Sequence, residues 1–522
     1  MQLSKLPILL LFLIFGSTLS AQNRYLEPKF SEVSVSPLTP YGFNYTFLPI
    51  LFGGHFTKQP LAMQVYTPVG DTETARPLII YLHTGNFFPF PANGSCGGAI
   101  NDSSNVEFAT RLAQMGYVVA VVDYRLGWNP FSTAELTRRF TLINGAYRGV
   151  QDVRSCIRYF RKNVAVDGND YGIDPNKIVV WGQGTGGYLS LATAYLDKFT
   201  EIYTTADPNK FKIPLPNGAF YPMVQESYNG DINGEQTAIG VVDATYNSIF
   251  SAFPLGDTMY IPNTPGYSSS FNLAVNMGGA LGDSSWMEAG DIPLISYHVP
   301  SDFFAPCETD ILNVPTAMGP QPVVEVSGSC DMQEIANSYG LNGVFNTIPA
   351  GHDPYGANSS SSFNGFYPFY GTPTPPGATM ESSGPWAWTS YAGTPAPTAS
   401  GCEVDGAVAR AYIDTIIGYY APRACVALNL GCNFVSTKEL NELELGLQVS
   451  PVPAVDAVTF QTKETPIRHI YVYDLSGRLV KAHTNINNNV FQMQRNSLQN
   501  GMYIAELRFD NGFVKRKVVF NN

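Results

Sequence analysis

A strand, a tight glycine turn and a helix follow one another without a break between residues 177 and 196. The apolar run ends at Trp181, the turn reads Gly182-Gln183-Gly184-Thr185-Gly186, and the helical pattern begins at Tyr188. In the pattern G-x-S-x-G, the middle residue lies on a strained strand-to-helix turn and presents a reactive oxygen. Gly184 stands at that middle position and has no side chain. The sequence therefore predicts a nucleophile elbow without its nucleophile.

Apolar runs of strand length alternate with helical patterns from about Leu61 to Tyr420. Continuous runs are typical of strands that are covered on both faces, and a helical pattern at 106–115 ends at Gly116. The strands are predicted at residues 78–82, 117–122, 178–181, 273–277, 294–298 and 323–326. This alternation predicts an α/β fold with a doubly wound, mostly parallel sheet between helix layers.

Two long segments interrupt the alternation, at about 199–270 and 355–400. In folds of this type such loops lie above the carboxyl ends of the strands, where sites form. The aromatic side chains of the second segment favour either a stacking platform for a flat or sugar-like ligand or packing of the loop onto its own domain. They are Phe363, Phe366, Tyr367, Phe369, Tyr370, Trp386 and Trp388.

The composition changes after Gly431. Residues 437–446 read as a polar linker, and from Leu447 the strands become short and alternating, with Ser-Gly and Asn-Gly turn signals between them. This pattern predicts a small antiparallel β-sandwich over residues 447–522. The main domain is accordingly expected over residues 22–436.

The first residues indicate export. Lys5 precedes an apolar run over residues 6–15, and small residues follow before Gln22, so we expect a secretory signal peptide over residues 1–21. No later segment is apolar for long enough to form a stable membrane span. The net charge of −12 argues against nucleic acid as a partner, because that partner requires clustered basic residues.

Seven cysteines fit an exported protein, since disulfides persist outside the cytoplasm. Cys425 and Cys432 read as a local clip, whereas Cys156 lies on a helix with apolar spacing and is expected to be unpaired. The connectivity of the others cannot be deduced from sequence: Cys96, Cys307, Cys330 and Cys402. No cysteine or histidine cluster has zinc spacing, so we expect neither a metal nor a cofactor.

The main domain resembles carboxylesterase-type α/β-hydrolases over nearly its whole length. His83-Thr84-Gly85 stands in the place of the family's HGG oxyanion loop, and Asp123-Tyr124-Arg125-Leu126-Gly127 resembles its DYRLG element. The segments 149–161 and 171–178 resemble the helix and the strand that lead into the elbow. Residues 298–306 resemble the family's acid motif at the end of a strand, and this resemblance makes Asp302 the expected acid. Gly351-His352-Asp353 resembles the family's histidine loop.

The tail resembles the type A C-terminal sorting domain of the type IX secretion system of Bacteroidota. Pro451-Val452-Pro453 matches the family's PNP opening with valine in place of asparagine. Residues 473–480, 498–503 and 515–519 are similar to its central strand, last hairpin and basic close. The resemblance implies an interaction with that secretion machinery, export across the outer membrane, and release or attachment at the cell surface.

In a working triad of this family, His352 would take the nucleophile's proton and Asp302 would orient the imidazole. The expected oxyanion donors are backbone amides of Thr185 and of the loop at Gly85 and Asn86. Losing the nucleophile of such a triad costs on the order of 10⁶-fold in kcat, so Gly184 should abolish acyl-enzyme chemistry. Two substitutes remain open: the Thr185 hydroxyl, and a water activated by His352.

Three functions are therefore compatible with the sequence. The first is a secreted esterase-like protein that no longer hydrolyses by the serine route and binds a small ester or a glycan-like ligand. The second is an active ester hydrolase that uses a water or a substitute hydroxyl. The third is a structural surface protein, for which the pocket has no role.

Overall fold

The computed structural model describes residues 24–522 apart from 91, 94–96, 315–318, 350–351, 371–382, 384–387, 389–403, 433, 435–439, 476–477, 485, 497, 510–511 and 522. The predicted signal peptide, Cys96, Cys402, Gly351 and Trp386 lie outside the described residues. The chain divides into two compact units, a main unit over Arg24–Cys432 and a second unit that contains the tail from Asn433 onward.

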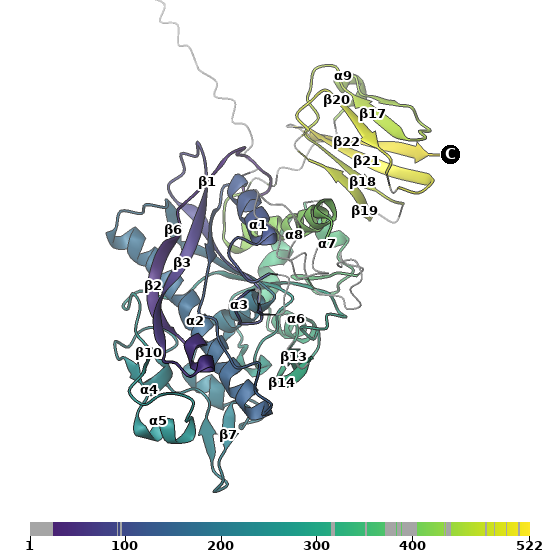
Figure 1. Cartoon of the computed structure of the whole chain (residues 1–522). Coiled ribbons are helices and arrows are strands. Elements are labelled where there is room, and N and C mark those ends of the chain that lie inside the picture. Colours follow the sequence, from purple (N-terminus) through teal and green to yellow (C-terminus); the bar gives the residue numbers. More distant parts are fainter. Residues whose placement is uncertain are drawn as a thin grey trace, which may run out of the picture. The chain divides into compact units, whose positions relative to one another are not determined.

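Nine strands of the described chain form the mixed sheet of the main unit (Figure 1). The strand order is β1-β3-β5-β4-β6-β11-β12-β15, with β2 paired to β3. The strands from β5 to β15 run parallel to their neighbours, and β1, β2 and β3 pair antiparallel. Their bounds are β1 Val33–Val35, β2 Thr39–Thr46, β3 Thr57–Pro68, β4 Arg76–Leu82, β5 Val118–Val122, β6 Ile173–Gln183, β11 Leu273–Met277, β12 Leu294–His298 and β15 Phe366–Pro368.

Helices cover both faces of this sheet, so the predicted α/β architecture is confirmed. One apolar cluster joins a face of the sheet to α2 (Glu135–Val166) and α3 (Thr185–Tyr195). The other cluster joins the opposite face to α1 (Ser103–Gln114) and α8 (Gly406–Ala427). Central strands such as β5 are wholly buried, which explains why they read as continuous apolar runs.

One predicted strand of the sheet is placed wrongly by the sequence. Residues 323–326 form part of β14 (Gln321–Val326), which pairs with β13 (Asp310–Val314) in a separate antiparallel hairpin. The sheet instead ends at β15, which comes from the segment expected to be an insertion. A short valine-rich segment looks alike in a sheet centre and in a hairpin packed on the core, so the pattern could not separate the two.

Most of the aromatic side chains described in the second insertion pack inside the main unit. Phe366 and Trp388 are buried in the second apolar cluster, and Tyr367 and Phe369 pack against it, whereas Tyr370 is exposed. These four aromatic side chains therefore pack the loop onto its own domain, and they do not form a stacking platform for a ligand.

The first insertion and its flanks form short elements around α2. They are η2 Phe199–Tyr203, β7 Lys212–Pro214, β8 Phe220–Pro222, α4 Glu226–Asn229, β9 Gly240–Val241, α5 Ala244–Ile249 and β10 Thr258–Tyr260, whereas η1 Leu48–Phe52 lies earlier in the chain, between β2 and β3. Side chains of α2 hold this segment through its backbone: Asn144 donates to Met223 O at 2.8 Å, and Tyr147 donates to Gly230 O at 2.6 Å.

The remaining short elements of the main unit follow β11. They are η3 Ser284–Trp286, α6 Ser329–Ser338, η4 Leu341–Thr347 and α7 Pro354–Ala357. Disulfides join Cys307 to Cys330 and Cys425 to Cys432, which confirms the predicted clip. Cys156 is free and buried, as expected.

The tail is an all-β unit with its own core, as predicted (Figure 1). One sheet has the order β16-β17-β20 and the other β19-β18-β21-β22, with antiparallel pairing in both. After α9 (Glu442–Leu445), the strands are β16 Gln448–Ser450, β17 Ala457–Gln461, β18 His469–Tyr473, β19 Leu479–His483, β20 Val490–Gln494, β21 Gly501–Phe509 and β22 Gly512–Phe520.

Candidate active site

The turn between β6 and α3 has the geometry of a nucleophile elbow. Gly184 lies at φ +51° and ψ −116°, a strained region for any residue with a side chain, and its N–H donates to Met277 O at 2.7 Å. Glycine is also needed on both sides: a Cβ on Gly182 would lie 1.9 Å from Gly186 O, and one on Gly186 would lie 2.3 Å from Leu82 O. Strand and helix therefore approach as closely as the sequence pattern implied.

The space that a side chain of residue 184 would occupy is filled by Thr84. An ideal Cβ built on Gly184 would lie 2.2 Å from Thr84 Oγ1 and 3.0 Å from Thr84 Cβ. The Thr84 methyl group points toward Gly97 instead, where a Cβ would lie 3.5 Å from Thr84 Cγ2. The hydroxyl of Thr84 thus stands in the volume where the family's serine side chain would be.

The loop after β4 approaches the first turn of α3. Gly85 and Asn86 both have positive φ, at +131° and +54°, and the Asn86 N–H donates to Thr185 Oγ1 at 2.6 Å. One of the two expected oxyanion donors is therefore engaged with a side chain in this structure. Thr185 begins α3, and its N–H belongs to the first-turn amides that have no acceptor within the helix.

The buried His83 anchors the same loop. Its Nδ1 lies 2.5 Å from Thr84 O, its Nε2 lies 3.4 Å from Asp123 Oδ1, and its ring stacks on Tyr124. Burial by itself lowers the pKa of His83, but the Asp123 carboxylate and the backbone carbonyl raise it above the usual value, because both face ring nitrogens. These contacts support a structural role for His83.

Asp302 lies beside the elbow, near the end of β11. Its Oδ2 lies 3.5 Å from the position of a Cβ on Gly278, which follows Met277. Its carboxylate accepts hydrogen bonds from Phe304 N at 2.8 Å and from Ser383, whose N lies at 2.8 Å and whose Oγ lies at 2.5 Å. Burial raises the pKa of Asp302 above its usual value. In this structure, Ser383 holds the expected acid.

His352 lies half-buried in the loop that precedes α7. The Asp302 carboxylate, beside the elbow, accepts hydrogen bonds from Phe304 and Ser383. The next residue, Asp353, caps α7 and forms an ion pair with Arg423 at 2.6 Å, which fixes this end of the loop. Pairing of Asp302 with His352 stays a prediction.

His298, at the end of β12, interacts electrostatically with Asp302. It is fully buried, with Nδ1 at 2.8 Å from Ser329 Oγ and Nε2 at 2.9 Å from Ala305 O. Burial lowers the pKa of His298, and both contacts suit a neutral ring that accepts from the serine and donates to the carbonyl. His298 therefore packs at a strand end.

An apolar cavity of about 90 Å³ lies between the loop after β4 and helix α3. Phe87, next to Asn86, lines one side, and Tyr188, one turn after Thr185, lines the other. Its wall is completed by apolar side chains from α2, the first insertion and the β13–β14 hairpin, among them Leu142, Ile202, Val224, Leu312 and Val326. The size and lining of the cavity suit a small apolar group.

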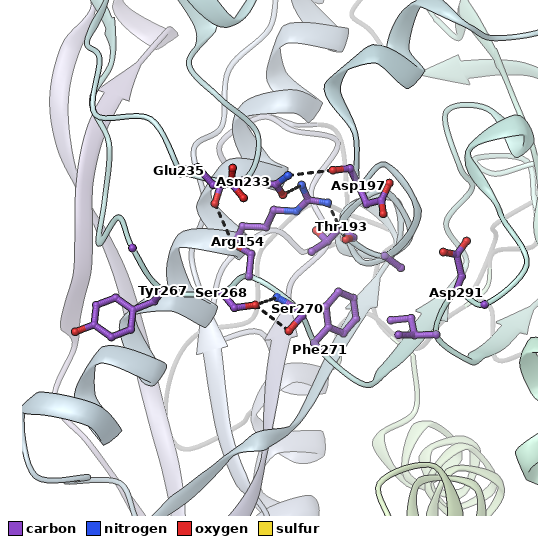
Figure 2. A pocket seen from close by; sticks show the side chains of 15 residues that line it. Arg154, Thr193, Asp197, Asn233, Glu235, Tyr267, Ser268, Ser270, Phe271 and Asp291 are labelled. Atoms are coloured by element: carbon purple, nitrogen blue, oxygen red, sulfur yellow. Dashed lines mark hydrogen bonds between the residues drawn. The ribbon is translucent and has the colours of Figure 1, made fainter.

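A second cavity, of about 670 Å³, opens at the other end of the sheet (Figure 2). It is lined by Phe271 and Ile292, which lie two residues before β11 and β12 begin, whereas the elbow lies where strands end. The Arg154 guanidinium in its wall is already bonded to Asn233 Oδ1 and to the carbonyls of Thr193 and Leu196. No group of three or more potential metal ligands occurs among the described residues.

Two contacts at the site were missed from sequence. Thr84 stands where the HGG loop that His83-Thr84-Gly85 resembles has its first glycine, and this difference is the signal that could have identified it. Ser383, which lies 81 residues after Asp302, gave no comparable signal.

Two family models match parts of this chain. Residues 63–214 match the family described as BD-FAE, and residues 448–521 match the Secretion system C-terminal sorting domain. The chain combines an esterase-like α/β-hydrolase domain with a type IX sorting domain. The sorting domain directs export to the cell surface or into the surroundings. No helix in the described part of the chain has the length and apolarity needed to cross a bilayer.

Individual relatives are distant or cover little of the chain. A segment of 126 residues, 23% of this chain, is 32% identical to Secreted lipase 5 of Gibberella zeae, and the match spans one fifth of that protein. Esterase 2 of Thermogutta terrifontis is 17% identical, with 52% of this chain and 72% of that chain covered and a TM-score of 0.28. A bifunctional GH43-CE protein of Bacteroides eggerthii is 14% identical, with 54% and 29% covered and a TM-score of 0.29.

Proposed function

We propose that the main unit is a secreted binding protein built on the esterase fold and that it does not hydrolyse esters by the serine route. One observation carries this proposal: Thr84 Oγ1 lies 2.2 Å from the place of a Cβ on residue 184. The nucleophile position thus lacks its oxygen, and a neighbouring side chain has taken its space. The apolar cavity beside Phe87 and Tyr188 remains and can hold a ligand.

Turnover of p-nitrophenyl butyrate by the full chain tests the loss of hydrolysis. We expect the wild type to be no faster than a His352→Ala variant, because the expected base has no nucleophile to activate. Equal rates at several pH values would support a binding protein. Clear wild-type turnover that disappears in His352→Ala would contradict the proposal.

A second function is favoured by the same contact. Because the Thr84 hydroxyl occupies the nucleophile's volume, it is a better placed substitute than the Thr185 hydroxyl, which accepts the Asn86 N–H. In that case, ester turnover should disappear in Thr84→Ala and persist in Thr84→Ser. Turnover that survives in Thr84→Ala would instead point to an activated water.

A further inference from the structure

We infer that the cavity beside the amino ends of β11 and β12 is a second ligand site and that it binds a small organic amine. The ammonium group lies at Asp197 and Asp291, and the carbon chain lies against Phe271 and Ile292. This site goes beyond the proposed function, because the elbow lies at the other end of the sheet. The volume of about 670 Å³ is typical of cavities that take small organic molecules.

One lysine ammonium serves several carboxylates at one side of the cavity. Lys198 Nζ has acidic neighbours at 2.7, 3.4 and 3.7 Å: Glu288, Glu201 and Asp197. Asp291 accepts a hydrogen bond from Glu288 N at 2.6 Å and forms no ion pair in the part of the chain that the structure describes. Burial raises the pKa of Asp291, and repulsion from Asp197 and Glu288 raises it further. A second cation at this side would relieve that repulsion.

Two further charged side chains line the cavity, and they have opposite signs. Figure 2 shows Glu235 and Asp291 on either side of the Arg154 guanidinium. Arg158 and Arg161 donate to the neighbouring serine segment, to Ser269 Oγ and to Ser268 O. Positive charge is therefore already present near Glu235 and the serines, and the unbalanced negative charge of the lining lies on the Asp291 side.

The carboxyl end of α3 adds to this negative potential. Thr193 and Ala194, in the last turn of the helix, line the cavity. The eleven residues of α3 align their peptide dipoles so that this end favours a cation. The Arg154 guanidinium already uses the same end, since it donates to Thr193 O at 3.0 Å and to Leu196 O at 2.7 Å.

The Thr193 hydroxyl is a hydrogen-bonding group that lacks a partner. Thr193 is 4% exposed, and its Oγ1 is buried without a hydrogen bond to any of the described residues. Figure 2 shows Thr193 at the wall of the cavity, near Asp197. A hydroxyl oxygen can accept from an ammonium group, so a bound amine would remove the cost of leaving this buried hydroxyl unsatisfied.

Apolar side chains in the same part of the cavity favour an organic cation. Figure 2 shows the Phe271 ring between Ser270 and Asp291, and Ile292 follows Asp291 in the lining. An alkyl chain covers these two apolar side chains while its ammonium group meets the carboxylates. Butylamine combines both parts and is a suitable probe.

The test compares butylamine with 1-butanol, which has the same shape and no charge, and with butyrate, which has the opposite charge. Each is titrated into the full chain at low salt and followed by ligand-observed ¹H NMR. We expect butylamine to bind most tightly and butyrate most weakly. Asp291→Asn should weaken butylamine binding about tenfold, because it removes a charge-assisted hydrogen bond. Thr193→Val, which keeps the shape of the side chain, should weaken it about fivefold.

Two control variants are expected to bind butylamine as the wild type does. Thr193→Ser keeps the hydroxyl, and Glu334→Gln removes an exposed carboxylate on α6, outside the lining of the cavity. The inference is wrong if butylamine does not bind, if 1-butanol binds as tightly, or if Asp291→Asn has no larger effect than Glu334→Gln. Thermal unfolding of each variant shows whether it is folded. Ester turnover reports on the elbow alone, so either hypothesis can fail without the other.

Discussion

Replacing Gly184 by serine is expected to destabilise the main unit instead of simply restoring a nucleophile. Two costs follow from the structure. A residue with a side chain at φ +51° is strained by about 1–2 kcal/mol. A Cβ at 2.2 Å from Thr84 Oγ1 overpacks the site, which costs a further ~1–3 kcal/mol. The free energy of unfolding should therefore fall by about 2–5 kcal/mol.

Rotation of the Thr84 side chain can relieve only part of this clash. A rotation exchanges Oγ1 for the methyl group or a hydrogen, but Thr84 Cβ stays 3.0 Å from the new Cβ. Thr84→Gly removes both contacts, so the double variant Thr84→Gly/Gly184→Ser should recover most of the overpacking cost. The coupling between the two positions should be about 1–3 kcal/mol in a double-mutant cycle.

Urea unfolding of the four proteins, followed by near-UV circular dichroism, measures this coupling. Gly70→Ser is the matched control, since Gly70 has φ +77° and nothing within 4 Å of its Cβ position, so it carries the strain alone. If Gly184→Ser costs no more than Gly70→Ser, or if Thr84→Gly brings no relief, the assignment of Thr84 to the nucleophile's space is wrong. Ester turnover in the double variant would additionally test whether Asp302 and His352 can still cooperate.

Three further outcomes can be measured. Asp152→Ala should destabilise the protein by about 3–5 kcal/mol in urea unfolding, because it leaves the fully buried Arg125 without its ion-pair partner. The raised pKa of His83 means that the stability from its contact with Asp123 is fully present below about pH 6.5 and is lost as pH rises through the folded-state pKa. A plot of Tm against pH for wild type and His83→Gln should therefore converge at high pH, and curves that stay parallel would contradict this. Burial raises the pKa of the Cys156 thiol, so peptide mapping after iodoacetamide treatment should find Cys156 unmodified until denaturant is added.

The strands and the elbow could be predicted because their signals are local. The run at 294–298 is β12 itself, and two glycines of the elbow meet local requirements: Gly182 lies against Gly186 O, and Gly184 lies in the turn at φ +51°. A short stretch of sequence is enough to show the hydrophobic pattern of a strand and the residue types of a turn.

The contacts that decide the chemistry are not local, and sequence reasoning missed them for that reason. Thr84 meets Gly184 across one hundred positions of the chain, and Ser383 reaches Asp302 from a segment that reads as an irregular loop. A departure from a family's motif shows that something has changed at residue 84. Only the folded geometry shows which space the new side chain fills.

The Cys425–Cys432 disulfide ties the end of α8 to the last residue of the main unit. In the described part of the chain, the two apolar clusters of the main unit end at Leu341 and at Cys432, and the cluster of the tail begins at Leu440. Each unit therefore has an apolar core of its own. A protease that cuts the chain between Cys432 and Leu440 would separate the sorting signal for export from the core of the main unit.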